Sequence, residues 1–481
     1  MPSSETTPSP VIFDRNFLHG FATSAVQIEG GSKAGGKGPS VWDRYCDKGQ
    51  IFDGSTCREA RSSFVLWERD VELLVALGAT AYRFSISWPR IMPTGSRHDP
   101  INEAGIEYYS NLIDRLLFHG IEPIVTIFHW DTPEALDASY GSWRNHTEMV
   151  PDFTAYARIL FERFGDRVSN WITINEPIAV NFFANMGLYK NWDAKADVWK
   201  SVYTMIRCHA EVSHLYKTVF QAVQKGRIGI TLSADWVEPI DSSDQAKEMA
   251  QRKLDFFFGV TLMTVDFGDY PESVKQAVGD RLPALSSDDK AKLKNSCDYF
   301  CLNSYSASWA LKGPAKDHQP GPFDDMFGNT HDTHHHPLTG EPIGNPGQPF
   351  FLFDTPWGFR KMLRYVQDRY LRPCRIPLFI TENGFAVKGE AELDETEARR
   401  GEDAERVAYF KGYLGELAAA VQEDDLRVCG YMAWTLMDNW EWKMGWTCRY
   451  GVSYVDPETQ QRVPKASARW IQQFFRSSVA R

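Results

Sequence analysis

The sequence predicts an α/β fold, a single (β/α)8 TIM barrel with elaborated βα loops, and three observations support this prediction. Apolar, β-rich runs alternate with amphipathic helical stretches along the whole chain of 481 residues. No shift in composition and no long linker divides the chain. Polar residues, carboxylates and Trp recur at the ends of the apolar runs, where an α/β barrel gathers its chemistry. We therefore expect a disordered tail over residues 1–11 and one domain over residues 12–481.

Eight apolar, β-rich segments are predicted as the barrel strands. In chain order they are residues 17–26, 80–86, 122–129, 168–175, 227–233, 297–305, 376–381 and 428–436.

Two of the connections show a clear helical pattern. Residues 64–77 place apolar side chains on one helical face, and residues 106–118 repeat the pattern. Gly78 and Gly120 follow these segments, as glycine often does where a helix ends. By contrast, residues 311–350 are rich in Pro, Gly, His and Asp, and we expect a long lid or surface loop there.

The composition limits the classes of partner. The chain carries 63 acidic against 52 basic side chains, a formal net charge of −11, so nucleic acid and anionic membrane surfaces are poor partners and a neutral ligand fits better. The sequence contains no apolar run of the length that spans a bilayer. No feature of the sequence predicts an oligomeric state.

The N-terminus and the cysteines predict a cytoplasmic protein. Residues 1–10 contain no Lys or Arg, and no apolar segment follows them, so we expect no secretory signal. The eight cysteines are scattered along the chain, which favours reduced thiols over a disulfide framework. Cys297 and Cys301 lie in an apolar run and are interpreted as core residues, and the His-rich segment 331–336 as a solvated loop. We predict no metal and no cofactor.

Two glutamates at predicted strand ends form the candidate catalytic pair. Glu176 follows the fourth predicted strand and Glu382 the seventh, and all strands of a barrel open onto the same mouth. Hydrolysis of a glycosidic bond needs one carboxyl group that protonates the leaving oxygen and one carboxylate that attacks the anomeric carbon. Arg83 and Tyr305 are expected near Glu382, where they favour its anion, so we predict Glu382 as the nucleophile and Glu176 as the acid. The alternative is a pair of ordinary strand-end carboxylates in salt bridges.

The motifs around these glutamates resemble those of glycoside hydrolase family 1, the β-glucosidase family, and in particular its fungal intracellular members. The similarity covers almost the whole chain. It rests on Gln27-Ile-Glu-Gly30, Tyr82-Arg-Phe-Ser-Ile-Ser-Trp88, Phe128-His-Trp-Asp131, Thr173-Ile-Asn-Glu-Pro177, Ile380-Thr-Glu-Asn-Gly384, residues 431–442 and Arg449-Tyr-Gly-Val-Ser-Tyr-Val-Asp456.

The resemblance implies a retaining β-glucosidase that acts on terminal β-D-glucosyl residues of cellobiose, short cello-oligosaccharides and aryl β-glucosides, with transglycosylation as a side reaction. Glu176 would be the acid/base and Glu382 the nucleophile, supported by Arg83 and Tyr305. The partner would be a small neutral saccharide. The implied substrate-binding residues are Gln27, His129, Trp130, Asn175, Asn303, Tyr305, Trp434, Glu441, Trp442 and Tyr450.

Several alternatives stay open at this point. A broader galactoside or fucoside preference fits the same residues. A 6-phospho-β-glycosidase shares Tyr450, but it would need cations near the sugar O6, where Glu441 and Cys448 stand instead. A non-catalytic sugar-binding barrel would have lost one of the paired glutamates. Metal-dependent hydrolysis would use the His-rich segment. Residues 182–199 lack the landmarks that commonly shape the aglycone wall in this family, so they predict no aglycone preference.

Overall fold

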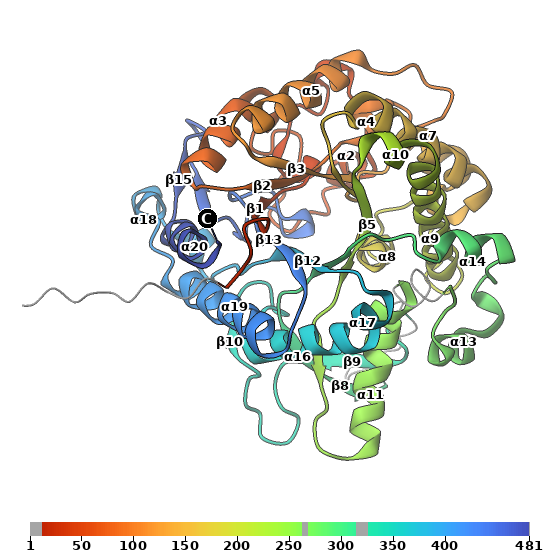
Figure 1. The fold of residues 1–481 in the computed structure, drawn as a ribbon, viewed down its shortest axis with the longest axis vertical. Coiled ribbons are helices and arrows are strands. Elements are labelled where there is room, and N and C mark those ends of the chain that lie inside the picture. The colour runs from red at the N-terminus through yellow and green to blue at the C-terminus, as the bar shows by residue number, and fades with distance from the viewer. Residues whose placement is uncertain (1–11, 262–267, 314–325, 481) are drawn as a thin grey trace, which may run out of the picture.

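A closed barrel of eight parallel strands forms the centre of the chain, which confirms the predicted fold class. The computed structural model describes residues 12–261, 268–313 and 326–480, so the expected tail over residues 1–11 lies outside the described residues. Figure 1 shows the helices arranged around the central strands. The strands follow the order β1-β13-β12-β7-β5-β4-β3-β2 around the barrel.

Each barrel strand overlaps one predicted segment, and their ends differ by a few residues. The strands are β1 (Leu18–Ala22), β2 (Ala81–Ser85), β3 (Glu122–Phe128), β4 (Asn170–Asn175), β5 (Arg227–Ser233), β7 (Phe300–Asn303), β12 (Leu378–Asn383) and β13 (Val428–Trp434).

The first predicted strand is too long, because the chain leaves the sheet after Ala22. Ser24 is extended and precedes a short helix, α1 (Ala25–Ile28), which turns the chain across the barrel mouth. The Ser85 hydroxyl accepts a hydrogen bond from the backbone N–H of Ala25 at 2.7 Å and fixes the start of this turn. The turn places Gln27 at the mouth instead of in a strand.

Helices connect the strands and cover the outside of the barrel (Figure 1). Gly78 and Gly120 follow the first two of these helices with φ of 67° and 70°, a conformation that glycine adopts without strain, so both predicted helix ends are confirmed. The main helices are α3 (Ser63–Ala76), α5 (Glu103–Phe118), α7 (His146–Phe164), α9 (Asp197–Leu215), α11 (Asp244–Leu254), α14 (Ser287–Leu293), α16 (Pro356–Val366), α19 (Ala404–Glu423) and α20 (Ala466–Ser478).

The segment predicted as a long loop contains two short strands where the structure describes it, β9 (Thr330–Thr333) and the two-residue β10 (Asn345–Pro346), which pairs with β11 (Phe353–Asp354). β9 pairs antiparallel with β8 (Ala307–Lys312), and β8 also pairs with β6 (Trp236–Glu238). The prediction missed β9 because its sequence, Thr-His-Asp-Thr, has no apolar alternation. Residues 314–325 lie outside the described part of the chain.

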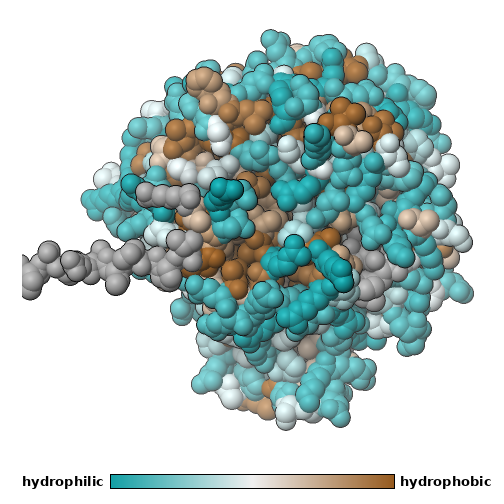
Figure 2. All heavy atoms as spheres, viewed as in Figure 1, coloured by the Kyte–Doolittle hydropathy of each residue, from teal (hydrophilic) through white to brown (hydrophobic). Residues whose placement is uncertain are grey.

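The two ends of the described chain pack against each other. The backbone N–H of Phe13 donates to the carbonyl of Ser478 at 3.0 Å, and the Phe13 ring stacks on Phe17 with ring centroids 4.2 Å apart. Phe475 of α20 packs against both rings. Figure 2 shows hydrophilic residues over most of the visible face, with groups of hydrophobic residues in its upper part and near its centre. Among the described helices, none is both long and apolar enough to cross a bilayer.

Candidate active site

The two candidate catalytic carboxyl groups lie at the carboxyl ends of β4 and β12. Glu176 directly follows β4 and precedes α8 (Pro177–Asn185), with φ of 47°, an uncommon backbone conformation for a glutamate. Glu382 is the fifth residue of β12. The two residues are 8% and 3% exposed, so each carboxyl group depends on protein partners.

Different neighbours surround the two carboxyl groups. Arg83 donates to Glu382 Oε1, and the Tyr305 hydroxyl donates to Glu382 Oε2 at 2.5 Å. Glu176 Oε1 accepts a hydrogen bond from Asn303 Nδ2 at 2.5 Å. Arg83 also donates to Asn175 Oδ1 at 2.6 Å and so links the ends of β2, β4 and β12. The arginine charge is in direct contact with Glu382 and not with Glu176.

These neighbours set the protonation of the pair. Burial and the charge of Glu382 raise the pKa of Glu176 to about 8, against smaller opposing effects of Asn303 and Arg83. Burial also raises the pKa of Glu382, but Arg83 and the hydrogen bonds from Tyr305 and Asn303 oppose the rise. Glu176 is therefore the group that keeps its proton near neutral pH, and Glu382 is the group that the site favours as an anion.

A second group of predicted residues, Gln27, Glu441 and Trp442, meets beside this pair. Gln27 Nε2 donates to Glu441 Oε2 at 3.0 Å and to Asn439 Oδ1 at 3.3 Å. Burial, and next the charge of Glu382, raise the pKa of Glu441 to about 8. Gln27 and Glu441 thus offer an amide and a carboxyl group to the hydroxyl groups of a ligand.

Aromatic rings form a wall around these polar groups. The His129 ring lies nearly parallel to Trp434 and to Trp442, with centroids 5.9 Å apart in each case. Burial and the charge of Arg83 hold the pKa of His129 well below its usual range, so the ring is neutral. Trp130 packs on Trp442 at 4.6 Å and donates from Nε1 to the carbonyl of Asn175. Flat apolar faces beside directional polar groups suit a pyranose ring.

Two further contacts complete the set of predicted residues. Tyr450 packs edge-on against Tyr305 with centroids 6.0 Å apart. Asn175 Nδ2 lies 3.2 Å from His129 Nε2, which joins the wall to the end of β4. Gly384 follows Glu382 at a point where a Cβ would lie 1.8 Å from the carbonyl oxygen of Trp434, so only glycine permits this approach of β12 to β13. Hydrogen bonds and ring contacts join ten of the twelve predicted substrate-binding and catalytic residues, together with Arg83, into one network, and Gln27 and Glu441 adjoin it because Glu441 directly precedes Trp442.

Three residues that border this site are not among the predicted site residues. Asn439 Oδ1 accepts a hydrogen bond from Gln27 Nε2, which also donates to Glu441, and Trp42 packs on Trp442 with ring centroids 4.8 Å apart. Asp235 lies two residues beyond β5 and accepts hydrogen bonds from the segment that carries Tyr305. Asp235 lies just beyond the apolar run of residues 227–233, as Glu176 lies just beyond the run of residues 168–175. The strand-end rule that selected Glu176 would have found Asp235.

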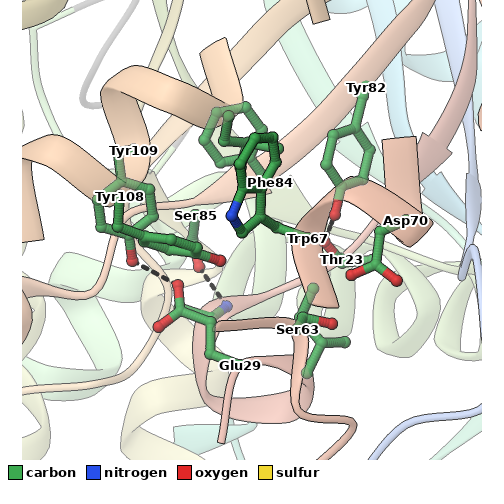
Figure 3. A pocket seen from close by; sticks show the side chains of 13 residues that line it. Thr23, Glu29, Ser63, Trp67, Asp70, Tyr82, Phe84, Ser85, Tyr108 and Tyr109 are labelled. Carbon is green, nitrogen blue, oxygen red and sulfur yellow. Dashed lines mark hydrogen bonds between the residues drawn. The ribbon is translucent and has the colours of Figure 1, made fainter. Parts of the chain in front are cut away.

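Glu29, which follows the first predicted strand, lies away from the mouth. Figure 3 shows it at a small cavity together with Tyr109, Tyr82 and Asp70, and the Tyr109 hydroxyl donates to its carboxylate. Arg90 donates to the other carboxylate oxygen at 2.9 Å. The cavity measures about 10 Å³, the size of one water molecule. Glu29 is a structural ion-pair partner behind the barrel wall.

The His-rich segment does not converge on one point. His334 stacks on Phe353, His331 Nδ1 contacts the carbonyl of Gly313, and His336 Nε2 contacts the carbonyl of Ile240. Within residues 12–261, 268–313 and 326–480, no group of three or more His, Cys, Asp or Glu side chains is placed to hold a metal ion. Each of these imidazole rings has a structural partner instead.

Comparison with known proteins agrees with this geometry. The family model for glycosyl hydrolase family 1 matches residues 10–479. The chain is 40% identical to beta-glucosidase 1B of Phanerodontia chrysosporium, over 100% of this chain and 88% of that protein. Its structure superposes on a family 1 β-glucosidase from Humicola insolens, solved in complex with glucose, with a TM-score of 0.92 and 37% identity over 98% of this chain and 100% of the other. A β-glucosidase from Trichoderma harzianum gives the same TM-score and identity over 98% and 99% of the two chains.

Proposed function

The chain belongs to glycosyl hydrolase family 1, and we propose that it removes terminal, non-reducing β-D-glucosyl residues from cellobiose, short cello-oligosaccharides and aryl β-glucosides. The enzyme is a glycoside hydrolase with a retaining mechanism, which is the mechanism of its family. The observation that carries the proposal is the asymmetric carboxyl pair, in which Glu382 contacts Arg83 and Tyr305 while burial raises the pKa of Glu176 to about 8.

The proposed mechanism has two steps. First, Glu382 attacks the anomeric carbon while Glu176 gives its proton to the departing oxygen, and a glycosyl ester forms. The ester removes the negative charge from Glu382, so the pKa of Glu176 falls and its carboxylate can act as a base. Second, Glu176 takes a proton from water, which attacks the same carbon and releases the sugar. A second sugar in place of water would give transglycosylation.

The pocket beside the pair supports a neutral glycone. Gln27 Nε2 donates to Glu441 Oε2 at 3.0 Å, and burial, and next the charge of Glu441, raise the pKa of the Cys448 thiol. A phosphorylated sugar would need cationic side chains at this point. We therefore favour glucosides over 6-phosphoglucosides. The similarity to proteins named beta-glucosidases supports a preference for glucosides over galactosides and fucosides.

The cysteine thiols support a reducing, cytoplasmic environment for the enzyme. None of the eight cysteines forms a disulfide in the structure, although the sulfur atoms of Cys46 and Cys57 lie 3.8 Å apart. A pair at this distance would be a candidate for oxidation outside the cell.

A substrate panel tests the proposal. We expect 4-nitrophenyl β-glucoside to give a higher kcat/KM than the matching galactoside and fucoside, and cellobiose to yield only glucose at low concentration. Longer products that appear at high cellobiose would demonstrate transglycosylation. Preparations of the E382Q variant control for contaminating glycosidases. A preference for 6-phosphoglucosides, or no hydrolysis of any β-glucoside, would overturn the proposal.

A further inference from the structure

Asp235 connects the end of β5 to the segment that follows β7. Its Oδ1 atom accepts three hydrogen bonds, from the backbone N–H of Tyr305 at 2.7 Å, the backbone N–H of Ser306 at 3.0 Å and the hydroxyl of Ser304 at 3.2 Å. The neighbouring N–H of Ala234 donates to the carbonyl of Asn303 at 2.9 Å. Three donors on three successive residues therefore converge on a single carboxylate oxygen.

The residue at the centre of this arrangement, Tyr305, is held from both sides of its backbone. Its carbonyl accepts hydrogen bonds from the hydroxyls of Tyr409 at 2.8 Å and Tyr413 at 2.9 Å. Its N–H is bound to Asp235, and its own hydroxyl donates to Glu382 Oε2 at 2.5 Å. The Tyr305 side chain is only partly buried, so the packing around the ring does not fix it alone.

We propose that Asp235 is a positioning residue, which holds the Tyr305 backbone so that the Tyr305 hydroxyl can bind the nucleophilic carboxylate Glu382. The inference rests on the proposed function, because Glu382 is taken as the nucleophile. Asp235 acts through Tyr305 and does not itself touch the reacting atoms. Without it, two backbone N–H groups at the mouth would lose their acceptor, and the segment 304–306 would move to find another.

The choice of residue type supports this role. Burial raises the pKa of Asp235 to about 6, and the N–H groups of Ser306 and Tyr305 and the Ser304 hydroxyl oppose the rise. The site thus places an ionised acceptor in a costly environment, where it is stabilised by the three groups that it holds. An asparagine side chain has the same shape and also offers an acceptor oxygen, so D235N should keep Tyr305 in place.

The rate of covalent labelling by 2,4-dinitrophenyl 2-deoxy-2-fluoro-β-glucoside tests the proposal directly. In this reaction the Glu382 carboxylate oxygen bonds to the anomeric carbon and dinitrophenolate leaves without a proton, so the rate reports the nucleophile and not Glu176. We expect D235A and Y305F each to slow labelling by about 10- to 100-fold, the loss typical of one hydrogen bond to a charged group. D235N should stay within about threefold of the wild type, because the acceptor is retained.

A double variant separates action through Tyr305 from a general structural effect. If Asp235 acts through Tyr305, D235A/Y305F should label no more than about threefold slower than Y305F alone. If the double variant slowed labelling by the product of the two single-variant factors, the proposal would be overturned. Labelling of D235A at the wild-type rate would overturn it as well. A folded D235N variant that labels as slowly as Y305F would also overturn it, and this arm holds even if D235A does not fold.

A matched control comes from Asp289, another buried aspartate that accepts hydrogen bonds from a backbone N–H and a serine hydroxyl, both of Ser286, at the start of α14. D289A should lose stability but label at the wild-type rate, and a loss equal to that of D235A would overturn the proposal. Failure of the proposed function would look different, because the wild-type enzyme itself would then not be labelled.

Discussion

At the scale of single residues, the site shows how one side-chain type takes two chemical states. Glu176 and Glu382 are both buried glutamates at strand ends, yet Glu382 has an arginine and a phenol as partners while Glu176 has an amide. Sequence motifs could identify both residues and their pairing. The state of each depends on atoms brought from other strands, which the sequence of the two motifs alone does not specify.

Replacing the nucleophile should abolish turnover without unfolding the protein. We expect E382Q to lose several orders of magnitude in kcat, because the covalent route that divides one difficult displacement into two easier steps is lost. Steady-state rates and a thermal melt would be measured together. E392Q, at an exposed position of the loop after β12, serves as the control and should keep full activity. Near wild-type turnover of E382Q would refute the assignment.

Loss of the acid should depend on the leaving group. We expect E176A to slow substrates with poor leaving groups by about 10²- to 10⁴-fold, the usual contribution of general acid catalysis, and activated aryl glucosides far less. Added azide should restore turnover and give the β-glucosyl azide, because the small anion attacks without a base. Chromatography of the products would show it. Equal losses on both kinds of substrate would count against an acid role.

The pH dependence should carry the signature of Glu176. Since its pKa is about 8 and the protonated form is required, kcat/KM for a poor leaving group should fall as pH rises through about 8. Glu441 has a pKa of about 8 as well, so the pH profile of one substrate cannot show which of the two groups causes the fall in kcat/KM. Activated aryl glucosides separate the two groups, because their hydrolysis does not need the acid. If kcat/KM for the activated substrates falls over the same pH range, the fall belongs to Glu441.

At the scale of elements, periodicity predicted where the strands lie better than where they end. The eight barrel strands follow from apolar runs, whereas the first ends at Ala22 because Ser24 and Ser85 turn the chain into α1. That turn depends on a contact between residues 60 positions apart, which no local pattern contains. Strand β9 was missed for a related reason, since pairing with β8 and not its own sequence makes it a strand.

The two glutamates at the carboxyl ends of β4 and β12 form the pair that sets the stereochemical outcome. In a retaining pair the carboxyl groups lie about 5 Å apart, too close to admit water between the carboxylate and the anomeric carbon. Attack by Glu382 inverts that carbon, and water inverts it again. A β-glucoside should therefore release the β-anomer first, which proton NMR would detect before mutarotation. An initial α-anomer would exclude Glu382 as the nucleophile.

At the scale of the whole molecule, a buried ionic network joins the last barrel elements. Glu390, in the loop after β12, accepts from Arg406 of α19 and from Lys465 before α20, and Lys465 also donates to Asp438 in the loop that leads to Glu441. All four side chains are at most 9% exposed. The sequence gives no pattern for this network, because its members are brought together only when the barrel closes.

Removal of one partner should destabilise the protein in a pH-dependent way. Despite burial, the charges of Arg406 and Lys465 lower the pKa of Glu390 to about 2, below its ordinary value of 4.5. The stabilisation by its carboxylate is therefore fully present above pH 4.5 and is lost as pH falls towards 2. E390Q should cost about 1.5–3 kcal/mol at pH 7, the loss typical of hydrogen bonds to charged groups, because Arg406 keeps Asp403 and Lys465 keeps Asp438 as a partner. Thermal or urea unfolding across pH 3 to 7 would measure the stability difference between wild type and E390Q, which should be constant above about pH 5 and become smaller below it.

E423Q, which removes an exposed partner of Arg360, serves as the control and should change stability by less than about 0.5 kcal/mol. The prediction would fail if the difference in unfolding free energy between wild type and E390Q became smaller as pH rises, or if E423Q lost as much stability as E390Q. Either result would show that the network does not stabilise the closed barrel.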